Sequence, residues 1–251
     1  MNATIALSTT GRVLRQLKAD PRTIAMILLI PVILMTLLYF MFENQVGPPG
    51  GPEPFHRIAL VLLGVLPFAI MFLITSIAML RERSSGTLER LLTTPMSKAD
   101  LLVGYAAAFS TAAMAQAALA CVVSFWILGL QTAGSIGWVL VIAILDAILG
   151  VGLGLLCSAF AQTEFQAVQF LPVVVIPQLF LCGLFVPRAD LPRWLEMISN
   201  VMPLSYAVEA LDQVGRYTDP TGTMWRDLLV VLLCTIAALA LAAASLRRRT
   251  E

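Results

Sequence analysis

Few side chains in this sequence could do chemistry, and those few are not arranged for it. The only histidine, His56, stands beside Arg57 in a short polar stretch. A single histidine excludes a motif such as HExxH, which needs two. Neither Lys18 nor Lys98 follows a glycine, so the sequence has no phosphate-binding GxxxxGK[ST] loop, and it has no GxSxG nucleophile motif. We therefore predict no catalytic residue and no metal site. The four cysteines stand singly in apolar runs and are expected to pack as small hydrophobic residues: Cys121, Cys157, Cys182 and Cys234.

Asp146 is the one ionisable residue deep inside a long apolar segment, near the middle of residues 136–160. A charged side chain at that depth in a bilayer costs about 2.5–3.5 kcal/mol, so the carboxyl should face a packed or wet interior. Asp146 either lines a transport pathway or relays protons, or it makes a structural hydrogen bond to a neighbour such as Gln116 or Ser110. The sequence leaves both interpretations open.

The composition excludes an ordinary soluble domain. Of the 251 residues, 59% are hydrophobic and 12% are charged, and the mean hydropathy is +0.89; soluble domains have about 45–50% apolar and 25% charged residues. The formal net charge is +1, so no overall basic field indicates a nucleic-acid partner. The chain is predicted to be a polytopic membrane protein.

Six uncharged apolar runs, apart from Asp146, are long enough to cross a bilayer, because about 20 residues at 1.5 Å rise span about 30 Å of hydrocarbon. No segment alternates polar and apolar residues, which argues against membrane strands. We predict an all-α membrane protein with six transmembrane helices. The runs are residues 24–42, 58–80, 103–128, 136–160, 165–186 and 228–246.

The orientation follows from the distribution of Lys and Arg. With the N-terminus inside, the inner segments hold 11 of these residues and the outer segments hold 5. Positive charge favours the inner side, so both termini are predicted to be cytoplasmic, in a plasma (inner) membrane. Four tryptophans agree, because they fall at or beyond the outer helix ends: Trp126, Trp138, Trp194 and Trp225.

The membrane domain, residues 24–246, has a cytoplasmic segment on either side. Apolar residues of segment 1–23 share one helical face with basic residues around it, so this segment is either an amphipathic interfacial helix on the membrane surface or a solvated basic tail. Residues 247–251 form a basic tail.

Glycines and prolines in the spans predict close packing and kinks. Gly150 and Gly154 form a GxxxG pattern, which lets two helix backbones approach closely, either within the chain or between subunits. Prolines in spans remove a backbone hydrogen bond and favour a bend: Pro31, Pro67, Pro172 and Pro177.

The inner loop at residues 81–98 carries the strongest functional pattern. Ser84 or Ser85 can cap a short helix, and Pro95 ends it. The apolar face of this helix must lie on the membrane surface or against a partner protein. Its leucines follow helical spacing on one face: Leu88, Leu91 and Leu92.

The run from Arg81 to Pro95, RERSSGTLERLLTTP, resembles the cytoplasmic coupling loop of the ATP-binding cassette (ABC) type-2 export permeases, and among them the daunorubicin-resistance permease subfamily. Six spans with both ends inside agree, so the resemblance covers nearly the whole chain. It implies that the loop docks into a separate ATPase subunit and that the turn at residues 161–164 makes a second, smaller contact. The implied coupling residues are Arg81, Glu82, Arg83, Gly86, Thr87, Leu88, Glu89, Leu91, Leu92 and Pro95.

The outer loop at residues 187–227 resembles the family's outer region, where short helices dip partway into the membrane. Its candidate residues are Pro192, Trp194, Pro203, Tyr206 and Glu209.

The resemblance implies a permease subunit of an ATP-driven exporter, of the multidrug-resistance type, that moves a hydrophobic substrate such as a drug, lipid or glycolipid. ATP and Mg²⁺ would be bound by the partner ATPase and no cofactor by this chain. A second copy or a homologue would complete the pathway, and membrane lipid would surround it. The alternative is a proton-coupled secondary transporter that uses Asp146, which would explain the buried carboxyl but not the inner helix.

Overall fold

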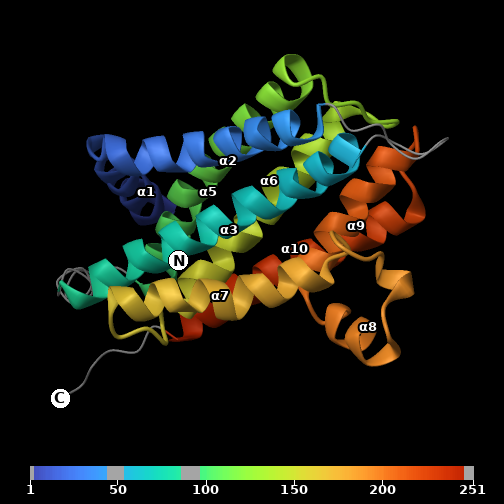
Figure 1. Ribbon diagram of the computed structural model, residues 1–251. Helices are drawn as coiled ribbons and strands as arrows, with labels where there is room; N and C mark the ends of the chain where they lie inside the picture. The colour runs from blue at the N-terminus through green and yellow to red at the C-terminus, as the bar shows by residue number, and fades with distance from the viewer. Residues whose placement is uncertain (1–2, 44–53, 86–96, 246–251) are drawn as a thin grey trace.

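The computed structural model describes residues 3–43, 54–85 and 97–245, and within these ranges the chain folds into helices and turns without a strand. The predicted all-α class is confirmed, and six of the helices are long and apolar enough to cross a membrane (Figure 1). The α-helices are α1 (Ala3–Ala19), α2 (Pro21–Phe42), α3 (Pro54–Ser84), α5 (Lys98–Val122), α6 (Ile136–Cys157), α7 (Glu164–Leu181), α8 (Arg193–Ser199), α9 (Pro203–Arg216) and α10 (Gly222–Ser245); a π-helical turn, Val123–Ile127, extends α5, and a 3-10 turn, Arg188–Asp190, precedes α8.

Polar side chains fix where the helices begin. Ser97 and Asp100 form a reciprocal capping box at the start of α5, in which each side chain accepts from the other's backbone N–H at 3.1 Å. The hydroxyl of Thr163 accepts from the backbone N–H of Gln166 at 3.2 Å and caps α7. Asp20 caps α2 in the same way.

The observed helices are longer or shorter than the apolar runs at particular ends. Helix α3 continues past the expected end at residue 80 to Ser84, and α10 begins at Gly222 instead of residue 228. Helix α7 ends at Leu181, five residues before the end of its apolar run. Hydropathy measures the hydrocarbon-embedded part of a helix, whereas hydrogen bonding and caps decide its ends.

The closest contact between spans is the crossing of α3 and α6, which the GxxxG pattern of α6 makes. A Cβ atom on Gly150 would overlap the backbone carbonyl of Phe68, and one on Gly154 would overlap the Thr75 hydroxyl and the Phe72 carbonyl. These two glycines therefore pack within the chain, which decides between the two interpretations of the pattern.

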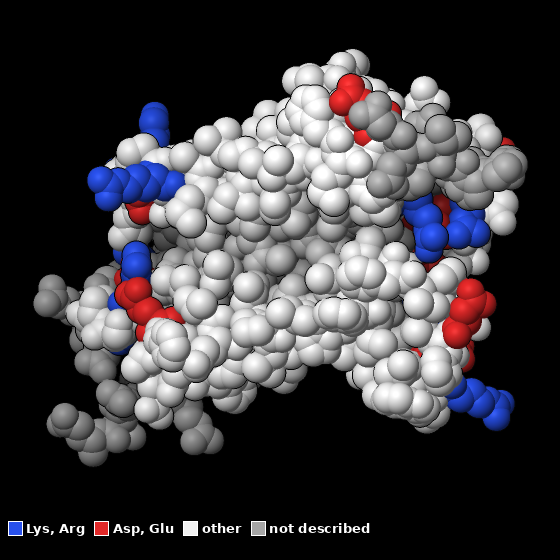
Figure 2. All heavy atoms as spheres, viewed as in Figure 1, with Lys and Arg blue, Asp and Glu red and all other residues white. Residues whose placement is uncertain are grey.

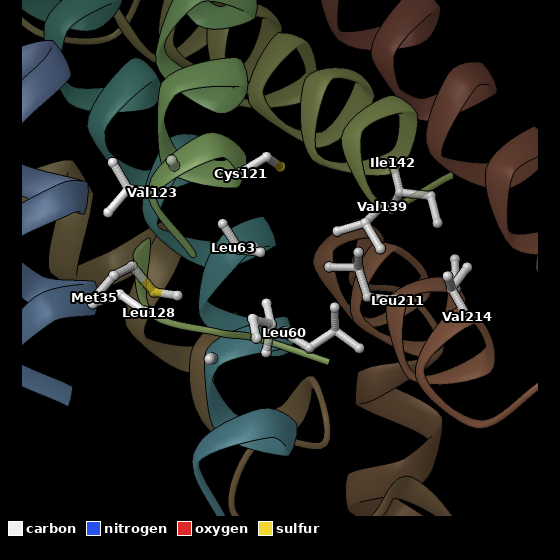
Figure 3. Close-up of a cluster of buried hydrophobic side chains, with 14 of the residues drawn as sticks. Met35, Leu60, Leu63, Cys121, Val123, Leu128, Val139, Ile142, Leu211 and Val214 are labelled. Atoms are coloured by element: carbon white, nitrogen blue, oxygen red, sulfur yellow. The ribbon is translucent and has the colours of Figure 1, made fainter. Parts of the chain in front are cut away.

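The other helices surround this pair. Helices α5 and α10 pack on α6, α1 lies across α5, and α2 and α7 lie on either side of α3 (Figure 1). Figure 3 shows how α9 enters the bundle, since Leu211 of α9 meets side chains of α3 and α6 in one buried cluster that includes Leu63 and Ile142. Thus α9 is not a surface loop but part of the core.

Charged residues gather at the two ends of the bundle and leave an uncharged belt between them (Figure 2). One end carries α1, the last turn of α3, the start of α5 and the turn from α6 to α7; we call it the α1 end. The opposite end carries α8 and α9, and we call it the α9 end. This separation is what a chain crossing a bilayer requires.

The α3–α6 contact gives a first prediction. Gly154→Ala should lower the thermal stability of the purified protein, because its methyl group overpacks against α3 at a cost of about 1–3 kcal/mol. Gly152→Ala is the matched control on the same helix, since its Cβ would meet Ala238 at an ordinary 3.4 Å. Thermal unfolding in detergent measures both; equal melting temperatures for the two variants would contradict the packing argument.

Candidate functional site

The first residues of the candidate coupling loop belong to a helix. Arg81, Glu82 and Arg83 lie in the last turn of α3, which corrects the expectation that the loop begins at Arg81. The residues expected to make the coupling helix lie outside the described residues: Gly86, Thr87, Leu88, Glu89, Leu91, Leu92 and Pro95. The structure therefore defines the base from which that segment starts.

Arg81 joins this base to the next connection at the α1 end. Its Nε donates to Oε1 of Glu164 at 2.8 Å and its Nη2 donates to Oε2 at 3.0 Å, which is a two-pronged ion pair. Glu164 is the first residue of α7 and closes the turn at residues 161–164. The two side chains are 63% and 53% exposed, so the pair adds at most about 1 kcal/mol of stability. The pair links the last turn of α3 to the first residue of α7.

Glu82 joins the same base to α1. Its Oε1 accepts from Nη1 of Arg12 at 3.3 Å, and Nη2 of Arg12 donates to the hydroxyl of Tyr105 on α5 at 2.7 Å. Arg83 is half-buried, and its Nε and Nη2 find no hydrogen-bond partner in the described part of the chain. Consecutive residues of α3 thus reach α7 and α1.

Asp146 is wholly buried where α3, α6 and α9 meet. A Cβ placed on Gly64 of α3 would lie 3.3 Å from Oδ2 of Asp146 and 2.8 Å from Leu211 of α9. Neither carboxyl oxygen has a hydrogen-bond partner among the described residues, and the buried amide of Gln116 has none there either. The proposed hydrogen bond to Gln116 or Ser110 is absent from this conformation.

Residues 187–227, predicted to lie on the outer side, contain two short helices, α8 and α9. Pro192 directly precedes α8, and Pro203 is the first residue of α9. Trp194 projects from α8 and is largely exposed. Tyr206 and Glu209 lie on α9, and the Tyr206 hydroxyl donates to the backbone oxygen of Asn200 at 2.8 Å.

Glu209 is the centre of an ion cluster that ties this region together. It pairs with Arg188 and, at 3.4 Å, with Arg226, which in turn pairs with Asp227 at 2.7 Å. Arg188 also donates to Asn200. We call Arg188, Glu209, Arg226 and Asp227 the α9 ion cluster. It links the segment after α7, helix α9 and the start of α10.

The sequence pointed to Glu209 but missed the rest of this cluster. Arg188 lies 21 residues before Glu209, and Arg226 lies 17 residues after it. Arg188 also lies over the Tyr206 ring, 5.0 Å from its centroid, at a distance typical of a cation–π contact. The one available signal was that charges of both signs bracket the α8–α9 stretch.

Together these features define a class: a multi-pass helical membrane protein with a charged base at one end and the short helix α9, held by an ion cluster, at the other. Residues 6–214 match the family model for the ABC-2 type transporter, and the chain belongs to that family.

Curated relatives agree with this family. The chain is similar to the probable multidrug ABC transporter permease YbhR of Escherichia coli K12, with 26% identity over 188 residues, which is 75% of this chain and 51% of that protein. It is also similar to the linearmycin resistance permease protein LnrN of Bacillus subtilis, with 26% identity over 62% of this chain and 42% of that protein. The chain thus spans about half the length of the curated relatives it matches.

The α9 ion cluster generates a prediction. Glu209→Gln removes the charge that holds two arginines and should destabilise the folded protein by about 1.5–3 kcal/mol, measured as a lower melting temperature in detergent. Glu196→Gln on α8 is the control, because Glu196 is exposed and makes no ion pair with the described residues. An equal effect of both changes would mean that the cluster does not hold α9.

Proposed function

We propose that this chain is the membrane-spanning permease subunit of an ATP-driven exporter that moves a hydrophobic substrate. In this proposal the α1 end faces the cytoplasm, both termini are cytoplasmic, and the protein resides in the plasma (inner) membrane. ATP and Mg²⁺ are bound by a separate ABC ATPase subunit, and this chain binds no cofactor of its own. Membership of the ABC-2 type transporter family supports the assignment.

One observation carries the coupling part of the proposal: two successive α3 residues make ion pairs with two different elements. Arg81 holds Glu164 at the start of α7, and Glu82 holds Arg12 of α1, immediately before the segment at residues 86–96. A docked ATPase that displaces this segment would therefore move the end of α3 and, through it, α1 and α7. Coupling then requires that ATP favour one of the two arrangements.

The peripheral spans support assembly with a second permease chain. Within α2 only Ile27, Pro31, Met35 and Leu38 are buried, and within α7 only Ala167, Val175 and Gln178. Their remaining apolar surfaces face outward along the hollow that Figure 2 shows on this side of the molecule. We infer that a second copy or a homologue faces this side and that the substrate pathway lies between the two chains.

The proposed cargo is an apolar or amphiphilic small molecule, such as a drug, lipid or glycolipid. The names of YbhR, for multidrug transport, and LnrN, for linearmycin resistance, support a drug-like cargo. The uncharged belt between the two ends of the bundle is compatible with such molecules.

The ion pair at the base predicts a charge-swap result. Arg81→Glu should lower ATP-dependent transport about fivefold or more without lowering the amount of folded protein, because the pair positions α3 against α7 while adding little stability. The double variant Arg81→Glu with Glu164→Arg should restore transport, measured in vesicles. A double variant no better than the single one would show that this pair has no part in coupling.

Docking predicts a partner. Purification of the tagged chain from native membranes in mild detergent should recover a stoichiometric ATPase subunit, and Leu88→Asp should abolish its recovery because a charge cannot enter an apolar docking groove. Leu88→Met keeps size and polarity and is the control, in which the ATPase should remain bound. Failure to recover an ATPase from wild-type membranes, where other complexes survive, would overturn the proposal.

A second candidate function rests on Asp146, whose buried carboxyl has no partner in the described structure. A proton-coupled secondary transporter would use this carboxyl as its relay. Asp146→Asn keeps the shape but cannot release a proton, so it separates the two functions. We expect the Asp146→Asn variant to retain ATP-driven transport in proteoliposomes. The second function would be favoured if the variant lost transport and the wild type transported substrate with a proton gradient and no ATP.

A further inference from the structure

A groove opens beside the base of α3 at the α1 end. Its volume is about 570 Å³, within the range of about 300–1,000 Å³ that ligand sites occupy. Helices α1, α2, α3 and α5 line it. In Figure 2 this face is hollowed, with charged side chains at its α1 end. Arg81 and Glu82 make ion pairs with α7 and α1, and no described side chain fills the groove beside them.

The groove changes from polar to apolar with depth. Its polar wall is formed where α2 begins, by Asp20 and Thr23, and where α3 ends, by Arg81. Leu73 lies eight residues before Arg81, which places it about 12 Å farther into the bundle. The deeper wall is apolar and is formed by Met26, Leu73, Ile74, Ile77 and Phe109. Such a profile fits an amphiphile whose head lies at the membrane surface and whose chain lies in the hydrocarbon.

Charges of opposite sign stand at the mouth. The Asp20 carboxylate accepts from the Thr23 hydroxyl at 2.6 Å and from its backbone N–H at 3.2 Å, and these bonds hold the Asp20 pKa below its usual range. Arg81 uses Nε and Nη2 for Glu164, which leaves its Nη1 group for another acceptor. The mouth therefore offers a fixed anion and a guanidinium to one ligand.

We propose that the groove binds a zwitterionic phospholipid from the leaflet at the α1 end. Its phosphate meets Nη1 of Arg81, its ammonium meets Asp20, and one acyl chain lies along Leu73 between α2 and α3. A lipid with a net negative headgroup fits less well, because Asp20 would face it without a compensating ammonium, whereas Glu82 is already paired with Arg12. The site shares Arg81 with the base of the proposed coupling segment, but lipid binding there requires no ATPase and does not depend on the direction of transport.

The lipid in the groove would act as a packing element for α2. Met26 of α2 is 54% exposed, and few α2 side chains are buried, so an acyl chain here supplies contacts that the protein does not. Occupancy would then stabilise the position of α2 relative to α3.

The test measures lipid retained by the purified full-length chain, with its partners, after exchange into detergent that contains phosphatidylethanolamine or phosphatidylglycerol. Native mass spectrometry should show one phosphatidylethanolamine bound per chain, with a preference of about tenfold over phosphatidylglycerol. Asp20→Asn should remove this preference, because it deletes the anion while Asn still caps α2.

A pair of matched substitutions distinguishes the groove from the general lipid surface. Leu73→Trp fills the groove and should lower retention about tenfold or more. Leu233→Trp makes the same change on the exposed, apolar face of α10 and should leave retention unchanged. Both variants must elute from size-exclusion chromatography as the wild type does, which shows that they are folded. If Leu73→Trp does not, the lipid preference of Asp20→Asn tests the proposal instead.

Three results would overturn the proposal. Equal retention of the two lipids by the wild type would mean that only annular lipid binds. Equal loss in Leu73→Trp and Leu233→Trp would mean the same. Loss of the lipid when the ATPase or a second permease chain assembles would mean that a protein surface covers the groove. Failure of lipid binding leaves recovery of the ATPase with the tagged chain unaffected, so the pull-down tests the proposed function separately.

Discussion

The backbone contact between α3 and α6 is the constraint on which the rest of the bundle depends. Gly150 and Gly154 bring α6 against the backbone carbonyls of Phe68 and Phe72, which is closer than any side chain would allow. In a bilayer, where apolar side chains gain little by leaving lipid, such close backbone packing is a principal source of helix association. Helices α5 and α10 then pack on α6, and α2 and α7 pack on α3.

This central pair also determines what its neighbours can do. Gly64 of α3 leaves room for Asp146 of α6 and Leu211 of α9 at the same point, so α9 and the buried carboxyl share one space. At the α1 end the last turn of α3 reaches both α1 and α7 through ion pairs. Stiff packing in the centre and a weak, exposed pair between Arg81 and Glu164 at the end are suited to a part that must move without unfolding.

Hydropathy and local patterns predicted the architecture but not the long-range contacts. The six apolar runs correspond to six observed helices, because hydrocarbon burial is a property of consecutive residues. The hydropathy pattern did not indicate that α3 runs on to Ser84, and the helix predicted to follow a cap at Ser84 or Ser85 lies outside the described residues. Arg81 and Glu164 are 83 residues apart, and no local pattern indicates that they pair. The sequence likewise could not predict that the Asp146 carboxyl has no hydrogen-bond partner among the described residues, because the sequence of one span does not determine which neighbouring helix each of its faces packs against.

Helix α3 is 31 residues long, about 46 Å, and therefore exceeds the roughly 30 Å of hydrocarbon that it crosses. Pro67 interrupts its hydrogen bonding next to Phe68, where the backbone is held against Gly150. The part from Pro67 to Arg81 is then a helical segment of about 21 Å that can pivot at Pro67 inside the membrane. Rotating that part of the helix by about 10° would displace its tip by nearly 4 Å, about two-thirds of the roughly 5.4 Å rise of one helical turn. A small angular change at one proline thus becomes a displacement large enough to exchange one set of surface contacts for another.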